Sequence, residues 1–194
     1  MLHTFMQIIE EKHSSGRFIL GIDGLGRAGK TTITEKLREE LTRKQIPFHI
    51  FHIDDHIVGR EKRYNTGHEQ WFEYYHLQWE VESLANNFLK KLRSAEQITL
   101  SFYDKETDTH TVREIKLTPT CCIIIEGVFL QRKEWRECFD YVVYMDSPQQ
   151  ARFLREDTQT QQNIDKLQER YWKAENYYVE TEKPHEQADI VLKS

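Results

Sequence analysis

Residues 24–31 read Gly24-Leu25-Gly26-Arg27-Ala28-Gly29-Lys30-Thr31, which matches the pattern G-x-x-x-x-G-K-[ST] in full. A short apolar run, residues 17–23, precedes the stretch, and residues 31–44 carry apolar side chains four apart, as on one face of a helix. A strand, a glycine-rich loop and a helix in this order can turn successive main-chain N–H groups toward a phosphate. The stretch therefore predicts an anion-binding turn between a strand and a helix.

Each part of this loop has an expected role. The main-chain N–H groups surround the phosphates, Lys30 reaches the β- and γ-phosphates, and the Thr31 hydroxyl binds Mg²⁺. The residues that we expect to contact a nucleotide are Gly24, Leu25, Gly26, Arg27, Ala28, Gly29, Lys30, Thr31 and Thr32.

The same glycines allow a second interpretation. Gly24, Gly26 and Gly29 fit G-x-G-x-x-G, the pattern of dinucleotide sites. That pattern has no use for the pair Lys30-Thr31, which favours the phosphate loop over a dinucleotide site or a glycine turn that binds nothing.

Composition limits the function classes. The chain has 194 residues, within single-domain range, and we expect one domain over residues 1–194. Its 32 acidic and 27 basic residues give a net charge of −5, which argues against broad nucleic-acid binding. No run approaches the ~18 apolar residues of a membrane span, and no leader pattern is recognisable at the start. We expect a cytoplasmic protein without membrane contact, and a homo-oligomer stays open. Three cysteines are expected to be reduced packing residues: Cys121, Cys122 and Cys138.

Apolar runs that alternate with helical patterns predict an α/β fold. Strands are expected over residues 17–23, 47–53, 121–125, 140–145 and 188–192, and helices over 2–9, 31–44, 69–93 (one long or two shorter) and 149–178. An antiparallel pair is expected over residues 98–103 and 111–117. The pattern predicts a doubly wound, mainly parallel sheet flanked by helices, of the P-loop NTPase type. To it are added a hairpin insertion at about 98–117 and a helical lid at about 149–170.

Carboxylates follow the predicted strands. Asp54, Asp55, Glu126 and Asp146 stand at strand ends, where ligands of such folds gather. We expect strand 47–53 to lie beside strand 17–23, which would place Asp54 to accept the proton of an acceptor hydroxyl or to hold Mg²⁺ through water. Glu126 follows five apolar residues and needs a metal, water or cation partner, so we assign it to the Mg²⁺ site. Turn or capping roles stay open for each, and for Asp146 helix capping is at least as well supported.

Further candidates carry weaker signals. Arg152 and Arg155 share a helix face, which suits a lid over the phosphates or an ordinary solvated surface. His52 and His56 have a zinc-like spacing but straddle a strand end, which disfavours zinc. An aromatic series could stack on a base, although its helical spacing is more typical of core: Trp71, Phe72, Tyr74, Tyr75 and Trp79.

Taken in order, these pieces resemble the uridine kinase and phosphoribulokinase group of P-loop kinases, from about residue 18 to 191. The resemblance implies ATP and Mg²⁺ as cofactors, Asp54 as catalytic base with Lys30, and Arg152 and Arg155 as lid arginines. Glu126-Gly127 and the closing strand from Ala188 to Val191 also match. Contacts to the acceptor are implied for Asp54, His56, Tyr103 (in Tyr103-Asp104) and His110.

The departures from that group fall on the acceptor side. His56-Ile57 replaces a usual aromatic pair, His68-Glu69-Gln70 stands where His-Pro-Asp is common, and Gln162 replaces a further lid arginine. The expected activity is γ-phosphoryl transfer from ATP to a hydroxyl of a nucleoside or similar small alcohol. A nucleoside monophosphate kinase stays open through Arg60, Lys62 and Arg63, and so does a nucleotide-binding switch, although no Asn-Lys-x-Asp guanine motif is found.

Overall fold

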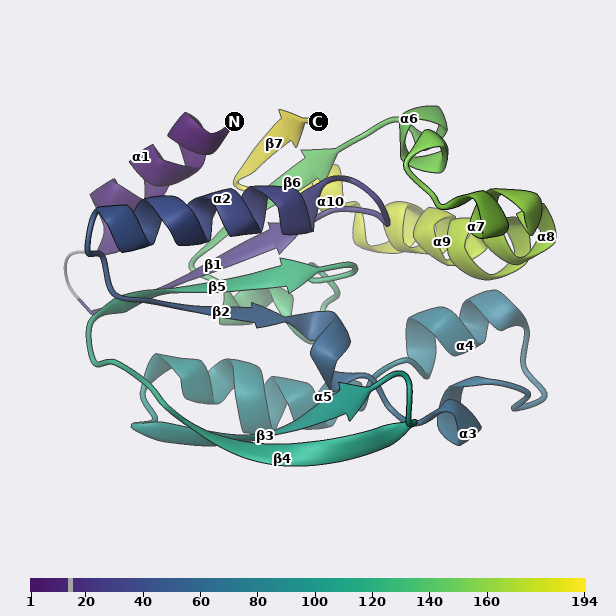
Figure 1. Cartoon of the computed structure of the whole chain (residues 1–194), viewed down its shortest axis with the longest axis horizontal. Coiled ribbons are helices and arrows are strands. Elements are labelled where there is room, and N and C mark those ends of the chain that lie inside the picture. The colour runs from purple at the N-terminus through teal and green to yellow at the C-terminus, as the bar shows by residue number, and fades with distance from the viewer. Residues whose placement is uncertain (14–15) are drawn as a thin grey trace.

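In the computed structural model, which describes residues 1–13 and 16–194, five parallel strands form the central sheet. Their order is β2-β5-β1-β6-β7. The strands are β1 (Arg17–Asp23), β2 (Phe48–His52), β5 (Cys121–Gly127), β6 (Tyr141–Asp146) and β7 (Ile190–Lys193). The predicted α/β class with a parallel sheet flanked by helices is confirmed (Figure 1).

One predicted neighbour is wrong. Strand β2 pairs with β5 and not with β1, because β5 lies between them, with Phe51 opposite Ile125 and His52 opposite Glu126. Every residue of β5 is buried, whereas β2 is mostly half-buried. A continuous apolar run is suited to the middle of a parallel sheet, and a mixed one to its edge. Asp54 therefore reaches the loop across the end of β5.

Side chains of each strand alternate between two apolar layers. On one face, Leu20 and Ile22 of β1 pack with α1 (Leu2–Lys12) and α2 (Lys30–Arg43), which confirms the expected N-terminal helix. Ile19 points to the other face, where it joins the core under the helical segment of residues 81–93. Figure 1 shows α1 and α2 above the sheet and that segment below it.

The predicted hairpin is a separate two-stranded sheet. Strands β3 (Gln97–Asp104) and β4 (Thr109–Lys116) pair antiparallel, with Tyr103 opposite His110. Ile98 and Leu100 of β3 are buried against the lower core, whereas β4 is exposed along nearly its whole length.

Residues 69–93 form two helical segments rather than one. The first is α4 (Gln70–His76); the second runs without a break through α5 (Val81–Leu84), η3 (Ala85–Leu89) and η4 (Lys90–Arg93). Between them the Trp79 side chain is buried and donates its indole N–H to the Ile53 carbonyl at 3.0 Å. That contact ties the break to η2 (Ile53–His56), and α3 (Arg60–Arg63) follows η2.

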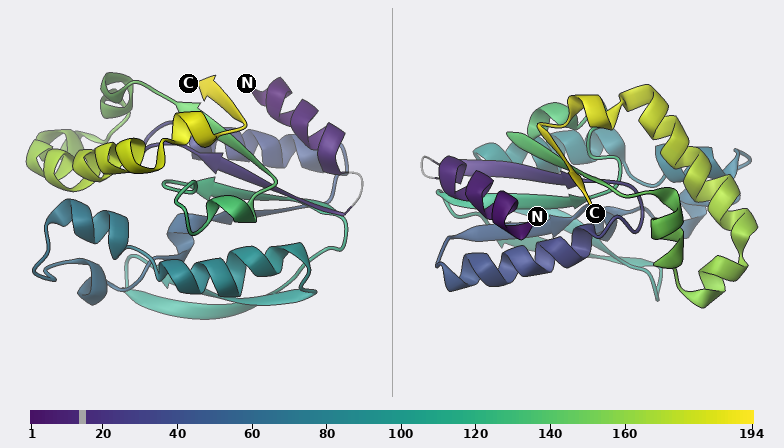
Figure 2. Two further views of the ribbon diagram at one scale, coloured as in Figure 1. Left: turned by 180° about the vertical axis from the view of Figure 1, so that it is seen from behind. Right: turned by 90° about the horizontal axis from the view of Figure 1, so that it is seen from above.

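The predicted helical region from residue 149 is broken into shorter pieces and reaches residue 182. They are α6 (Gln149–Leu154), α7 (Thr158–Gln162), α8 (Ile164–Lys166), η6 (Leu167–Trp172) and α9 (Lys173–Glu182). Asp157 accepts from the Thr160 N–H at 2.8 Å, and Asn163 accepts from the Lys166 N–H at 3.4 Å. These side chains start new helices, which explains the breaks. Figure 2 shows α7 to α9 extending beyond the strands.

The chain ends with α10 (Pro184–Gln187) and β7, and η5 (Arg136–Cys138) precedes β6. Among the described residues, no helix combines the length and apolar character that a bilayer crossing requires. The three cysteines are buried and free, as expected.

Candidate active site

A cleft of about 850 Å³ opens at the carboxyl ends of the strands, between the phosphate loop and the segment of residues 149–170. It brings together most of the predicted site. The predicted residues that line it are Gly26, Arg27, Ala28, Gly29, Lys30, Thr31, Thr32, Asp54, Glu126, Arg152 and Arg155. Gly24 and Leu25 belong to the loop but are not among the lining residues.

The loop is shaped by close backbone contact and ends at a helix N-terminus. A Cβ atom on Gly24 would stand 2.7 Å from the Met145 carbonyl oxygen, so a larger residue would push the loop off β6. Helix α2 begins at Lys30, and the first N–H groups of a helix have no partner inside it. These donors and the helix dipole favour an anion at this end of the loop.

Lys30 is buried and folded onto the loop. Its Nζ donates to the Gly24 and Leu25 carbonyl oxygens, at 2.9 Å each. Burial lowers the pKa of Lys30, and the nearby carboxylates, Glu126 foremost, oppose this shift. An ammonium group has three donors, so one remains for a phosphate oxygen.

The Glu126 carboxylate has two side-chain partners, Thr31 and His52. Thr31 Oγ1 donates to Glu126 Oε1 at 3.3 Å, and His52 Nδ1 lies 2.6 Å from the same oxygen. The hydrogen bond to Glu126 raises the pKa of His52, despite partial burial. A hydroxyl and a carboxylate side by side form an oxygen donor set that fits Mg²⁺. No local pattern in the sequence links His52 to Glu126, which lie 74 positions apart.

Asp54 reaches this edge because β5 ends in a glycine. An added Cβ on Gly127 would lie 2.1 Å from Ile53 Cγ2, so the missing side chain is what lets η2 pack against the end of β5. Asp54 follows Ile53 and is open to the cleft. The surrounding protein raises the pKa of Asp54 by desolvation; Lys30 lowers it and Glu126 adds to the rise.

The other two strand-end carboxylates lie apart from the cleft lining. Asp55 follows Asp54 in η2 and is half-buried. Asp146 Oδ1 lies 3.3 Å from His185 Nε2. Helix α6 begins after Pro148, and no side chain caps it, so Asp146 does not have the capping role that its position allowed.

His56, Tyr103 and His110, which the resemblance assigned to acceptor binding, do not line this cleft. His56 and His110 line a second cavity, of about 660 Å³. His56 Nδ1 lies 2.8 Å from the Ser101 carbonyl oxygen, and His110 Nε2 lies 2.9 Å from that of Ile57. Tyr103 donates to Asp108 at 2.8 Å and accepts from Arg63 at 3.0 Å.

The zinc alternative is not supported. His52 and His56 have separate partners, and the described residues contain no group of three or more metal-binding side chains. In the aromatic series, Tyr75 and Trp79 are buried core, as expected, whereas Tyr74 lines the cleft.

Sequence reasoning missed Asp23, the last residue of β1. It is fully buried, and desolvation raises its pKa. Its carboxylate accepts from the Tyr178 hydroxyl at 2.5 Å, the Gln131 side chain at 2.9 Å and the Leu130 N–H at 3.2 Å. Asp23 therefore anchors the start of the phosphate loop to α9 and to the segment after β5.

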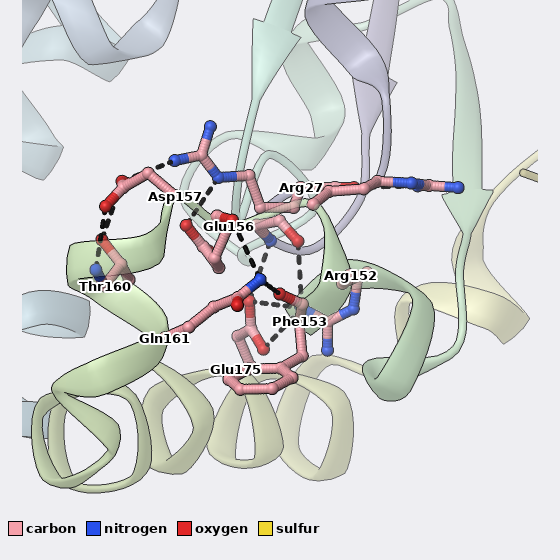
Figure 3. A network of polar contacts seen from close by, with 10 residues as sticks. Arg27, Arg152, Phe153, Glu156, Asp157, Thr160, Gln161 and Glu175 are labelled. Atoms are coloured by element: carbon pink, nitrogen blue, oxygen red, sulfur yellow. Dashed lines mark hydrogen bonds and ion pairs between the residues drawn. The ribbon is translucent and has the colours of Figure 1, made fainter.

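Sequence reasoning also missed Glu175 on α9, which lines the cleft and touches the loop. Its Oε1 accepts from the Gly26 N–H at 2.8 Å, and both of its oxygens accept from Arg152 Nη1 at 2.9 Å. Burial raises the pKa of Glu175, which Arg152 opposes. Figure 3 shows this network between α6, α9 and the loop.

The segment of residues 149–170 is joined to the loop at further points. Arg27 Nε pairs with Glu156 at 2.8 Å (Figure 3). Arg155 Nη1 donates to the Arg27 carbonyl oxygen at 2.9 Å. Arg152 and Arg155 therefore both donate to carbonyl oxygens of the phosphate loop, and Arg152 also pairs with Glu175 of α9.

Comparison with known proteins identifies the family. The model of the phosphoribulokinase/uridine kinase family matches residues 19–193. A uridine kinase of Borrelia duttonii (strain Ly) is 25% identical over 186 residues, which cover 90% of this chain and 85% of the relative. A uridine kinase of Macrococcus caseolyticus (strain JCSC5402) is 29% identical over 142 residues, 71% of this chain and 66% of the relative.

Among solved structures, a protein of Bacillus stearothermophilus described as a possible uridine kinase superimposes with a TM-score of 0.87. It is 49% identical, and the match covers 98% of this chain and 96% of that one. The family model covers nearly all of the chain, and the loop, Asp54 and Glu126 meet in one cleft. The chain therefore belongs to the phosphoribulokinase/uridine kinase family and is a kinase of that type.

Proposed function

We propose that this chain transfers the γ-phosphoryl group of ATP, with Mg²⁺, to a hydroxyl group of an uncharged small molecule, a nucleoside or a similar alcohol. The observation that carries the proposal is the convergence of the phosphate loop, Asp54 and Glu126 on one cleft. Phosphoryl transfer requires positioning, charge neutralisation and an oriented acceptor more than covalent chemistry by the protein.

The residues have distinct roles in this proposal. The loop N–H groups and Lys30 bind the phosphates, and Thr31 and Glu126 bind Mg²⁺. The bound nucleotide and metal supply a transferable phosphoryl group whose charge is partly neutralised. Asp54 accepts the proton of the acceptor hydroxyl, because its carboxylate is open to the cleft and close to Lys30. The lid arginines complete the phosphate end of the cleft.

The walls beside Asp54 favour an uncharged acceptor with a ring. Tyr74 and Tyr171 stand perpendicular, 4.9 Å between ring centroids, and both line the cleft with Leu167. Such a wall suits a base or the apolar face of a sugar. Curated relatives bear the name uridine kinase, which supports a nucleoside. His56-Ile57 stands where the group usually has an aromatic pair, so the proposal does not extend to the identity of the nucleoside base.

Arg60, Lys62 and Arg63, the candidate ligands for the phosphate of a phosphorylated acceptor, do not line the cleft and bind other protein groups. Arg63 is buried and donates to the Val58 carbonyl oxygen at 2.8 Å. Lys62 pairs with Glu80 at 2.8 Å, and Arg60 donates to the Lys105 carbonyl oxygen. This supports an acceptor without a phosphate over a nucleoside monophosphate.

The test is an ADP-release screen with MgATP and a panel of acceptors, each offered with and without a 5′-phosphate. We expect stoichiometric ADP formation with one unphosphorylated alcohol. Turnover only of the phosphorylated members would contradict the acceptor class and would implicate Lys166, a cation that does line the cleft. Tight nucleotide binding without acceptor-dependent turnover would favour a nucleotide switch. A cytoplasmic location, compatible with the free cysteines, is part of the proposal.

A further inference from the structure

The Glu175–Arg152 pair forms hydrogen bonds with both main-chain groups of one phosphate-loop residue, Gly26. Glu175 Oε1 accepts from the Gly26 N–H at 2.8 Å, and Arg152 Nη1 donates to the Gly26 carbonyl oxygen at 3.0 Å. The two side chains are joined to each other at 2.9 Å and are only 5% and 7% exposed. Both main-chain polar groups of Gly26 are therefore hydrogen-bonded to the pair. Figure 3 shows the Arg152 and Glu175 side chains side by side.

These hydrogen bonds leave the rest of the loop available for an anion. The N–H groups in the first turn of α2 have no helical partner, and Lys30, Thr31 and Thr32 of that turn line the cleft. Arg152 balances the charge of Glu175, so the carboxylate does not face the phosphates as an isolated negative charge. A Cβ on Gly26 would stand 3.2 Å from Glu175 Oε1, which shows how closely the carboxylate is seated.

Helix α9 is anchored at a second point of the same loop. Tyr178, three residues after Glu175 and on the same helix face, donates to Asp23 at 2.5 Å. Asp23 directly precedes Gly24, so α9 holds the loop both at its start and at Gly26. Helix α9 therefore contacts the loop region at two points.

We propose that Glu175 is a positioning residue: with Arg152 it holds Gly26 so that the phosphate loop keeps its phosphate-binding shape. Arg152 then acts through the loop. Arg155 is exposed, and in the described residues its protein contacts involve Nη1, which leaves Nε and Nη2 to reach the transferred group. The inference rests on the proposed function, since it assumes that the loop binds a nucleotide.

The test compares Glu175→Gln with a matched control, Glu182→Gln. Glu182 lies on the same helix, is 9% exposed and accepts a hydrogen bond from Tyr75 at 3.1 Å, but it is remote from the loop contacts. We expect Glu175→Gln to raise the Kd of MgATP, measured by calorimetry, about 10-fold, and Glu175→Ala about 100-fold, as for a lost charge-assisted hydrogen bond. Glu182→Gln should leave that Kd within about 2-fold even where it lowers Tm.

Arg152→Lys and a double variant test the same proposal if Glu175→Gln fails to fold. Arg152→Lys keeps the charge but loses the forked contacts, and we expect it to weaken MgATP binding while the KM for the acceptor stays constant. The double variant Glu175→Gln, Arg152→Lys should raise the Kd of MgATP no more than the single variant with the larger increase does, because both residues act as one unit. Unchanged or tighter MgATP binding in Glu175→Gln, or equal weakening in Glu182→Gln, would overturn the proposal. Absence of MgATP binding by the wild-type chain would instead reject the proposed function.

Discussion

Four carboxylates of the described residues line the cleft, those of Asp54, Glu126, Glu156 and Glu175, and their partners differ. Glu156 pairs with Arg27 at 2.8 Å. Glu126 is bound by Thr31 and His52, and Glu175 is paired with Arg152. Asp54 accepts no hydrogen bond from a side chain of the described residues, and it is open to the cleft. A carboxylate with free acceptor sites is the one that can take a proton from an incoming hydroxyl. The free acceptor sites of Asp54 therefore support the proposal that Asp54 is the base.

Replacement of Asp54 by Asn tests this role. We expect turnover to fall about 10² or more, the usual contribution of a general base, while the Kd of MgATP stays similar because the loop is untouched. Steady-state kinetics and calorimetry measure the two quantities. Asp55→Asn, at the neighbouring and half-buried position, is the matched control and should keep its turnover. Equal losses in the two variants would remove Asp54 from the mechanism.

The raised pKa of Asp54 predicts where activity is lost in acid. The base works only when ionised, so kcat/KM for MgATP is retained above its pKa and falls as the pH drops through it. Desolvation by the surrounding protein raises that pKa above the ordinary 3.8, so the fall begins at a higher pH than for an Asp with its ordinary pKa. The measurement is a pH profile of the wild type and of Asp55→Asn, whose acid limb should move to lower pH because the Asp55 charge adds to the rise in the pKa of Asp54. An identical limb in the residual activity of Asp54→Asn would assign it to another group.

The residues found from sequence are those with a local signal. The loop is a contiguous motif, and Asp54 and Glu126 end apolar runs, so their placement follows from chain order. Glu175 has no such signal, because it contacts Gly26 across 149 positions and lies within a helix that carries no motif. Its spacing to Tyr178 and Glu182 marks one helix face, but sequence alone does not tell a buried polar face from a solvated one.

At the scale of elements, the order of strands was the weak point of the sequence analysis. Periodicity identified the strands, but it did not show that β5 separates β2 from β1. Asp54 still reaches the cleft, because η2 turns over the end of β5 where Gly127 leaves room for Ile53. The breaks at residues 157 and 163 were likewise missed, since Asp and Asn caps are easily read as interior polar positions.

Gly127→Ala should separate stability and catalysis from nucleotide binding. Its Cβ would lie 2.1 Å from Ile53 Cγ2, so η2 must shift and carry Asp54 with it. We expect a loss of about 1–3 kcal/mol in the free energy of unfolding, as for other overpacked sites, and a lower kcat with little change in the Kd of MgATP. Urea denaturation and kinetics provide the measurements. Gly59→Ala controls for the loss of glycine itself, because Gly59 has a φ of −59° and its Cβ would make only an ordinary contact with Asp108 Oδ1, at 3.8 Å. A normal kcat in the folded Gly127→Ala variant would show that η2 does not set the position of Asp54.

At the scale of the whole molecule, the sheet separates two apolar layers, and the cleft lies at one end of it. The layer with α1 and α2 is built from fully buried residues such as Phe5, Ile9 and Leu37. The class of fold was predictable because buried parallel strands read as continuous apolar runs between helical patterns. The place of the β3–β4 hairpin relative to the main sheet, and the cavity beside it, could not be predicted, because periodicity does not show how a hairpin outside the main sheet packs.

Core stability and nucleotide binding should therefore be independent across the molecule. Phe5 is completely buried in the layer of α1 and α2, so Phe5→Ala should lower the free energy of unfolding by about 3–5 kcal/mol. MgATP at 100 times its Kd should add about 2.7 kcal/mol to the wild type, by binding the folded state alone. Phe5 does not line the cleft, so the same increment is expected in Phe5→Ala, measured by urea denaturation with and without MgATP. A smaller increment in the variant would mean that the α1 layer and the phosphate loop are coupled through α2.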